Sequence, residues 1–79
     1  MFRVGDFVRE KNSGRKGTVA SVSNWISKIK LMDDLDAKIF VENLRVRYGN
    51  NFKDKYQSVL VVFGKVSKWF EKVELEKDE

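Results

Sequence analysis

A basic turn lies near the start of the chain, between two short apolar stretches, in the sequence Asn12-Ser13-Gly14-Arg15-Lys16-Gly17. Two glycines three positions apart bracket Arg15 and Lys16. Such a loop can bind phosphate, because glycines let backbone N–H groups approach an anion and basic side chains neutralise it. The same residues are typical of a plain hairpin turn, in which glycine supplies a positive φ. The two interpretations are compatible, so we predict a hairpin turn and keep both basic residues as candidate phosphate contacts.

No established phosphate-loop motif accompanies this turn. The Walker spacing of glycines before Lys-Ser/Thr is absent, and Gly64-Lys65 lacks the upstream glycine. In KH domains, a G-x-x-G loop that joins two helices clamps a nucleic-acid backbone. Here strands, not helices, are expected on both sides of the turn. Any phosphate contact here would therefore depend on side-chain charge.

Two predicted strands, Trp25–Met32 and Leu44–Tyr48, carry further basic residues at alternate positions. These residues are Lys28, Lys30, Arg45 and Arg47. Because alternate residues of a strand point to opposite faces, each pair would form a basic stripe able to follow a phosphate backbone. The alternative is an ordinary solvated face, which also protects strands from aggregation.

Aromatic residues could supply a stacking platform beside these charges. The best candidates are Trp25, Tyr48 and Trp69, each of which could instead lie in the core or at its rim. Trp69 and Phe70 are adjacent, so a strand would turn them to opposite faces, one buried and the other more exposed. We include Trp25 and Tyr48 in the predicted nucleic-acid site.

Catalysis and metal binding lack their usual residues, because the chain contains no histidine and no cysteine. No G-x-S-x-G motif is present either. Asp33, Asp34 and Asp36 form an acidic cluster, but without EF-hand spacing they predict a turn or a helix cap rather than a cation site. We therefore predict a non-enzyme without cofactor or metal.

The charge of the chain is +4 and is unevenly distributed. Residues 1–70 contain 14 Lys and Arg against 7 Asp and Glu, whereas residues 71–79 contain 2 against 5. A basic body favours polyanions or an acidic protein face as partners. No apolar run approaches the length of a membrane span or a signal peptide, which predicts a cytoplasmic protein that does not bind membranes.

The turn signals and apolar patterns predict one mainly β domain over residues 1–75, followed by an acidic, frayed tail at 76–79. Further strands are expected at Phe7–Lys11 and Thr18–Val22. For residues 52–75, an amphipathic helix competes with two strands, and we favour strands at Gln57–Phe63 and Val66–Leu75 that turn at Gly64-Lys65. Residues 33–43 fit either a short helix capped by Asp33 or Asp34, or a strand.

The order of these signals resembles small SH3-like barrels, including KOW and Tudor-like domains. The similarity rests on "VGDFV…GRKGTVASV" at the start, "LRVRYGN" in the middle and "SKWFEKVELE" at the end. It leaves out Trp25–Asn43 and Asn51–Gly64, which would be insertions, one of them with a short helix. The resemblance implies a small antiparallel SH3-like barrel that contacts RNA, nucleoprotein assemblies or peptides. Short proteins of this appearance also occur in phage genomes.

Our first functional prediction is a binding module for RNA or DNA, or for a transcription or translation assembly, that uses a basic barrel face. The alternative is a protein-interaction adaptor or inhibitor, of the kind that phages encode, that uses loops or a strand edge. A third hypothesis is an oligomer formed by pairing of the apolar strand Val59–Phe63 with a neighbouring copy.

Overall fold

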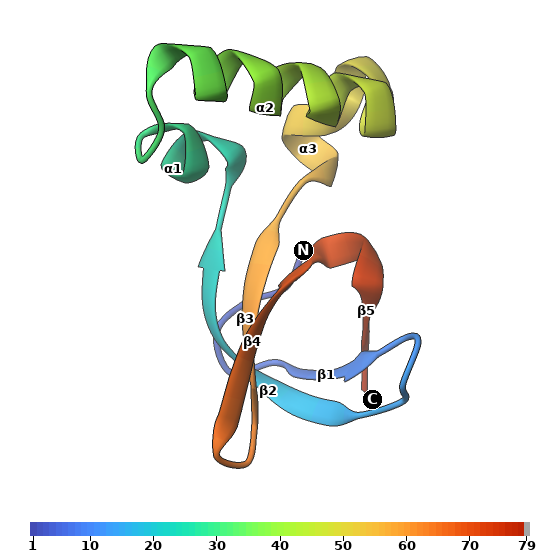
Figure 1. Ribbon diagram of the computed structural model, residues 1–79. Coiled ribbons are helices and arrows are strands. Elements are labelled where there is room, and N and C mark those ends of the chain that lie inside the picture. Colours follow the sequence, from blue (N-terminus) through green and yellow to red (C-terminus); the bar gives the residue numbers. More distant parts are fainter. Residues whose placement is uncertain (79) are drawn as a thin grey trace. The chain divides into compact units, whose positions relative to one another are not determined.

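The computed structural model describes residues 1–78 and shows two compact units. The first unit comprises Met1–Val22 together with the chain from Gln57 onward, and the second comprises Ser23–Tyr56 (Figure 1). The chain therefore leaves the first unit after β2, forms the second unit, and returns to the first. Each unit has its own buried cluster and is described by itself.

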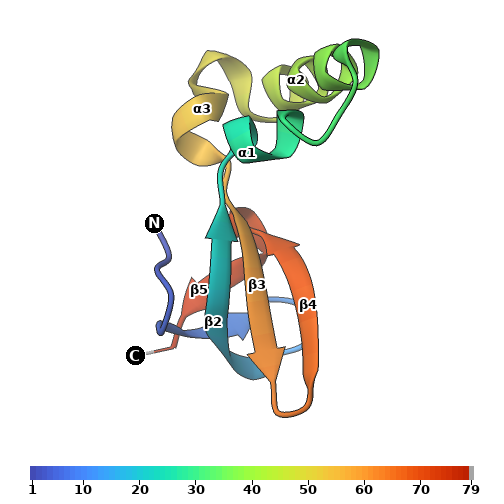
Figure 2. The same ribbon diagram turned by 90° about the vertical axis from the view of Figure 1, so that its left-hand side faces the viewer.

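The first unit is one antiparallel sheet with strand order β4-β3-β2-β1-β5. Its strands are β1 (Phe7–Glu10), β2 (Lys16–Ser23), β3 (Ser58–Phe63), β4 (Val66–Glu71) and β5 (Leu75–Lys77). A 3-10 turn, η2 (Lys72–Glu74), connects β4 to β5. Figure 2 shows β2, β3 and β4 side by side.

Most strand predictions for this unit are confirmed, and three details are corrected. The favoured pair of strands after Gln57 is present, although a 3-10 turn and a fifth strand replace the end of the second one. Glu76 and Lys77 belong to β5 and pair with β1, so the prediction of a frayed tail is wrong for them. The sheet is open, with β4 and β5 as its edges, so the closed barrel is also corrected.

Both hairpins turn at glycines that adopt a positive φ. Gly14, at +73°, lies between β1 and β2, and Gly64, at +64°, lies between β3 and β4. Few other residue types adopt this conformation without strain. Along each strand, every second side chain points to the same face of the sheet, and the apolar ones on this face share a core. The buried members of this core are Phe2, Val8, Val19, Val59, Val61, Phe70 and Leu75.

Gln57 fastens the amino-terminal segment to this core. Its buried side chain accepts a hydrogen bond from the Phe2 N–H at 3.0 Å and donates one to the Phe2 carbonyl at 2.9 Å. Replacing Gln57 with alanine leaves two buried backbone groups without partners. We expect Gln57→Ala to lower the free energy of unfolding by about 2 kcal/mol, measured by urea denaturation. Exposed Lys65→Ala serves as the control, and an equal loss in both variants would contradict this role.

The second unit is helical, which corrects two strand predictions. It contains α1 (Trp25–Ile29), α2 (Asp34–Tyr48), η1 (Gly49–Asn51) and α3 (Phe52–Lys55). The predicted strands Trp25–Met32 and Leu44–Tyr48 are therefore wrong. Of the alternatives left open for residues 33–43, the helix is present, and Asp33 rather than Asp34 is its cap. The Asp33 carboxylate accepts a hydrogen bond from the Asp36 N–H at 2.8 Å, and Asn24 caps α1 in the same way.

Packing explains why α2 is a helix. Its buried and half-buried residues are Ala37, Phe40, Val41, Leu44 and Tyr48; apart from the adjacent pair Phe40 and Val41, successive members are three or four positions apart. This spacing places them on one helix face. Phe52 and Tyr56 complete the core, where Trp25 meets Phe52 and Phe40 meets Tyr56 edge to face, each with 5.7 Å between ring centroids. Among residues 1–78, no helix is long and apolar enough to cross a membrane.

Candidate nucleic-acid interface

The structure divides the predicted nucleic-acid residues between the two units. Arg15 and Lys16 lie in the first unit, at the β1–β2 hairpin. The other predicted residues lie in the second unit, and they are Trp25, Lys28, Lys30, Arg45, Arg47 and Tyr48. The eight residues therefore do not form one face of a single compact unit.

The β1–β2 turn is held by its own hydrogen bonds. The Gly14 N–H donates to the Glu10 carbonyl at 2.8 Å, and the Glu10 N–H donates to the Arg15 carbonyl at 2.9 Å. The Ser13 hydroxyl donates to the Glu10 carboxylate at 2.6 Å and accepts from the Arg15 N–H at 3.2 Å. The predicted hairpin is thus confirmed, and the turn presents Arg15 and Lys16 as exposed side chains.

Arg15 lies against an aromatic pair at the end of the sheet. Its guanidinium carbon is 4.4 Å from the centroid of the Phe63 ring, and Phe63 packs edge to face on Phe70 at 5.8 Å. On the other ring, the Lys68 ammonium is 5.2 Å from the Phe70 centroid. Attraction between a cation and a ring face positions both charges, and neither forms an ion pair with a carboxylate of residues 1–78.

Lys65 and Lys68 join this end of the sheet, and sequence analysis did not include them. Lys65 is exposed in the β3–β4 turn, two residues from Phe63. Lys68 faces Val61 across the β3–β4 ladder, on the same side as Phe70. We call the four residues Arg15, Lys16, Lys65 and Lys68 the basic end. The turn signal at Gly64-Lys65 was visible in the sequence, but the approach of Arg15 to Phe63 depends on tertiary packing.

Two carboxylates lie close to the basic end and moderate its charge. The Lys16 ammonium is 3.8 Å from the Asp78 carboxylate, a long ion pair between partly exposed groups. Glu10 accepts the hydrogen bond from Ser13 within the same turn. Exposed ion pairs of this length are weak, so Lys16 keeps most of its attraction for an external anion.

The basic stripes predicted in the second unit do not exist, because both segments are helical. Successive helical residues are turned by about 100°, so Arg45 and Arg47 lie about 200° apart around α2. Arg45 pairs with Glu42 at 2.7 Å, and the Arg47 guanidinium lies 5.3 Å from the Tyr48 ring centroid. Lys28 is half-buried on α1, and Lys30 is its C-cap.

The two predicted stacking residues belong to the rim of the helical core. Trp25 and Tyr48 are half-buried and pack on the cluster formed by Leu44, Phe52 and Tyr56. The Lys53 ammonium lies 5.1 Å from the Trp25 ring centroid. Trp69 is instead 46% exposed on β4, opposite in direction to buried Phe70, as the strand alternation predicted.

No protein-family model, curated protein or solved structure matches this chain. The acidic cluster of the second unit provides the Asp33 helix cap, and within residues 1–78 no group of acidic side chains is arranged to hold a metal ion.

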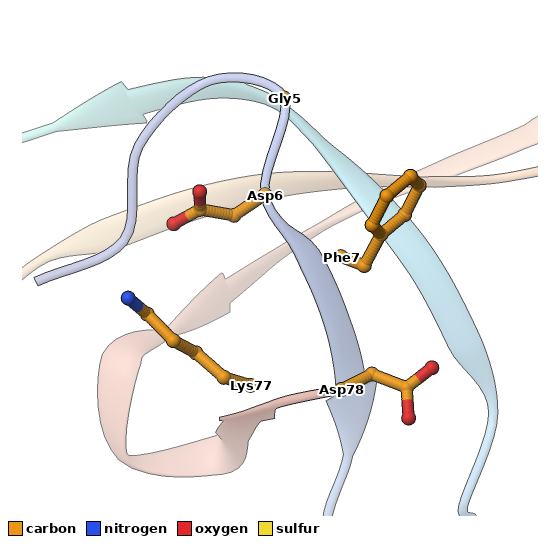
Figure 3. A pocket seen from close by; sticks show the side chains of 5 residues that line it. All are labelled: Gly5, Asp6, Phe7, Lys77 and Asp78. Atoms are coloured by element: carbon orange, nitrogen blue, oxygen red, sulfur yellow. The ribbon is translucent and has the colours of Figure 1, made fainter.

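A hollow of about 220 Å³ lies in the first unit beside the start of β1. Its lining residues are Gly5, Asp6, Phe7, Lys77 and Asp78 (Figure 3). Asp6 and Lys77 extend to one side of β1, and Phe7 and Asp78 extend to the other. Two carboxylates and one ammonium make this lining less attractive to phosphate than the basic end.

Proposed function

We propose that the first unit is an SH3-like domain and that the chain is a non-catalytic module that binds RNA or DNA. The strand order supports the fold proposal, because β1 lies between β2 and β5 and a short 3-10 turn precedes β5, an arrangement expected of an SH3-like sheet. The similarity of the sequence to KOW-type domains supports the nucleic-acid proposal.

The observation that carries this function is the basic end itself. Four cations lie on two adjacent hairpins, and two of them contact aromatic rings rather than carboxylates. Such side chains are partly ordered before binding, which reduces the entropy lost when they contact phosphates. Each phosphate contact would release condensed counterions, so binding should weaken as salt increases.

The test is fluorescence anisotropy with labelled single-stranded RNA, single-stranded DNA and duplex DNA over a series of salt concentrations. We expect Arg15→Ala/Lys16→Ala to weaken binding and to reduce the slope of log K against log salt by about 1.5, the value for two lost phosphate contacts. Lys65→Ala/Lys68→Ala should behave similarly.

The matched control is Lys30→Ala/Lys55→Ala, which removes the same charge from exposed sites in the second unit. This control should leave most of the slope intact. An equal loss in both double variants would mean that net charge alone is responsible, and a wild-type affinity insensitive to salt would overturn the proposal.

A protein-interaction adaptor or inhibitor, of the kind that phages encode, is the second candidate. The open sheet favours it, because β4 is an edge strand that pairs with β3 on one side only among residues 1–78, and a partner strand can add to its other side. The discriminating experiment is affinity capture before and after nuclease treatment. Partners that remain after nuclease support this candidate, and partners that disappear support nucleic-acid binding.

A further inference from the structure

Helix α2 is apolar on two opposite faces, of which only one is packed. Leu44 is 1% exposed and lies in the core of the second unit. Leu35 and Ile39 are 67% and 51% exposed, and Val46 is 85% exposed. At about 100° per residue, these three side chains fall within about 40° of one another and about 140° to 180° from Leu44. We call Leu35, Ile39 and Val46 the outer stripe.

The outer stripe is unlike the scattered apolar residues found on most protein surfaces. A helix at the surface of a globular protein usually carries polar residues opposite its packed face. Three large apolar side chains aligned over three turns are instead typical of a helix that packs on another helix.

The charges that flank the outer stripe indicate which helix would pack against it. The first turn of α2 is acidic, with Asp34 and Asp36, and its last turn is basic, with Arg45 and Arg47. A second α2 in antiparallel orientation therefore opposes each acidic end with a basic end. We propose that the chain forms a two-fold dimer in which the outer stripes of two α2 helices pack against each other.

The register follows from the stripe. A two-fold axis between Phe40 and Val41 places Leu35 beside Val46 of the second copy. Apolar side chains therefore meet at both ends of the helix pair. On one flank, Asp34 then lies near Arg45 of the second copy, displaced along the helix by about 3 Å, the rise of two residues. Such antiparallel pairing also aligns the helix dipoles favourably.

Glu42 is the polar residue in this contact, and the register supplies its partner. It lies between Ile39 and Val46 on the helix surface and pairs with Arg45 of its own chain. In the proposed dimer, Lys38 of the second copy lies on the same flank, displaced by about 1.5 Å along the axis. The dimer thus contains two equivalent Lys38–Glu42 pairs between copies.

Cysteine crosslinking tests the register directly, because the chain has no cysteine of its own. Leu35→Cys and Val46→Cys variants, when mixed and oxidised, should form a mixed disulfide dimer. Leu35→Cys alone should crosslink poorly, since its two copies would be separated by about 16 Å along the axis. Equal crosslinking in both experiments would overturn the register.

Charge exchange tests specificity without removing any apolar contact. Lys38→Glu and Glu42→Lys should each weaken the homodimer, because each places like charges opposite one another. Mixing the two variants restores both opposite-charge pairs, so sedimentation should show a heterodimer tighter than either homodimer. Circular dichroism of each variant checks that the helices remain folded.

Leu35→Asp should raise the dissociation constant of the dimer on the order of a hundredfold, because a two-fold contact contains the substitution twice. Val22→Asp is the control, since it alters an exposed apolar residue of the first unit. A wild-type chain that remains monomeric up to millimolar concentration would overturn the proposal. The outer stripe would then be a contact surface for a different protein.

Discussion

Replacing Leu44 with alanine is expected to lower the stability of the helical unit by about 3 kcal/mol. Leu44 is 1% exposed and is the buried residue of α2, where it packs with Phe52 and Tyr56. The substitution removes apolar contacts and leaves a cavity that neighbouring side chains fill only in part. Because this cluster has few members, little else compensates for the loss. Amide hydrogen exchange of residues 34–48 measures the effect.

Leu35→Ala is the matched control, since it makes the same chemical change in the same helix. Leu35 is two-thirds exposed, so its truncation should change stability by less than about 0.5 kcal/mol. The comparison is made at a concentration where the chain is monomeric, so that dimer contacts do not contribute. Similar losses at both positions would show that α2 does not pack through the face that contains Leu44.

The helical unit also shows where sequence patterns mislead. Leu44–Tyr48 alternates apolar and basic residues as a half-buried strand does, yet Val46 is exposed on the opposite side of the helix from Leu44. The alternation arises because α2 is apolar on two faces. The correct signals were the cap residues Asn24 and Asp33 and the spacing of apolar residues over 37–48.

The strands of the first unit could be predicted because local signals agree there. Glycine turns at Gly14 and Gly64 bound segments rich in β-branched residues, and over residues 57–75 these two signals outweigh a competing helical spacing. The strand Val59–Phe63 lies between β2 and β4, so both of its edges are paired. The hypothesis that it pairs with a neighbouring copy is therefore wrong.

The candidate site was predicted in part, for a physical reason. Arg15 and Lys16 could be named because a turn exposes its side chains whatever surrounds it. Lys68 could not, because its place near Arg15 and Lys16 depends on the pairing of β2 with β3, which brings the two hairpins together. Registers and cross-hairpin contacts are tertiary properties, and neither composition nor periodicity contains them.

The role of Gly17 differs from the one predicted for the turn glycines, which was to supply a positive φ. Its φ is not positive, so backbone freedom is not what requires glycine here. A Cβ at this position would lie 2.5 Å from Val61 Cγ1, 2.8 Å from the Val62 carbonyl oxygen and 2.9 Å from Phe63 Cδ1. The missing side chain allows β2 to approach β3 closely.

We expect Gly17→Ala to destabilise the first unit by about 3 kcal/mol, because relief of these contacts requires β2 and β3 to separate. The shift of Phe63 would also disturb the ring that Arg15 contacts, so the nucleic-acid binding proposed for the basic end should weaken even under conditions where the variant is folded. Urea denaturation measures the first effect, and anisotropy measures the second.

Gly14→Ala separates close packing from backbone strain in the same hairpin. Gly14 has a φ of +73°, and an added Cβ there would meet no atom within 4 Å. Its substitution should cost about 1 kcal/mol through backbone strain alone and should leave the Arg15–Phe63 contact in place. If Gly14→Ala proves the more damaging of the two, then the turn conformation, and not the approach of β2 to β3, determines the position of the basic end.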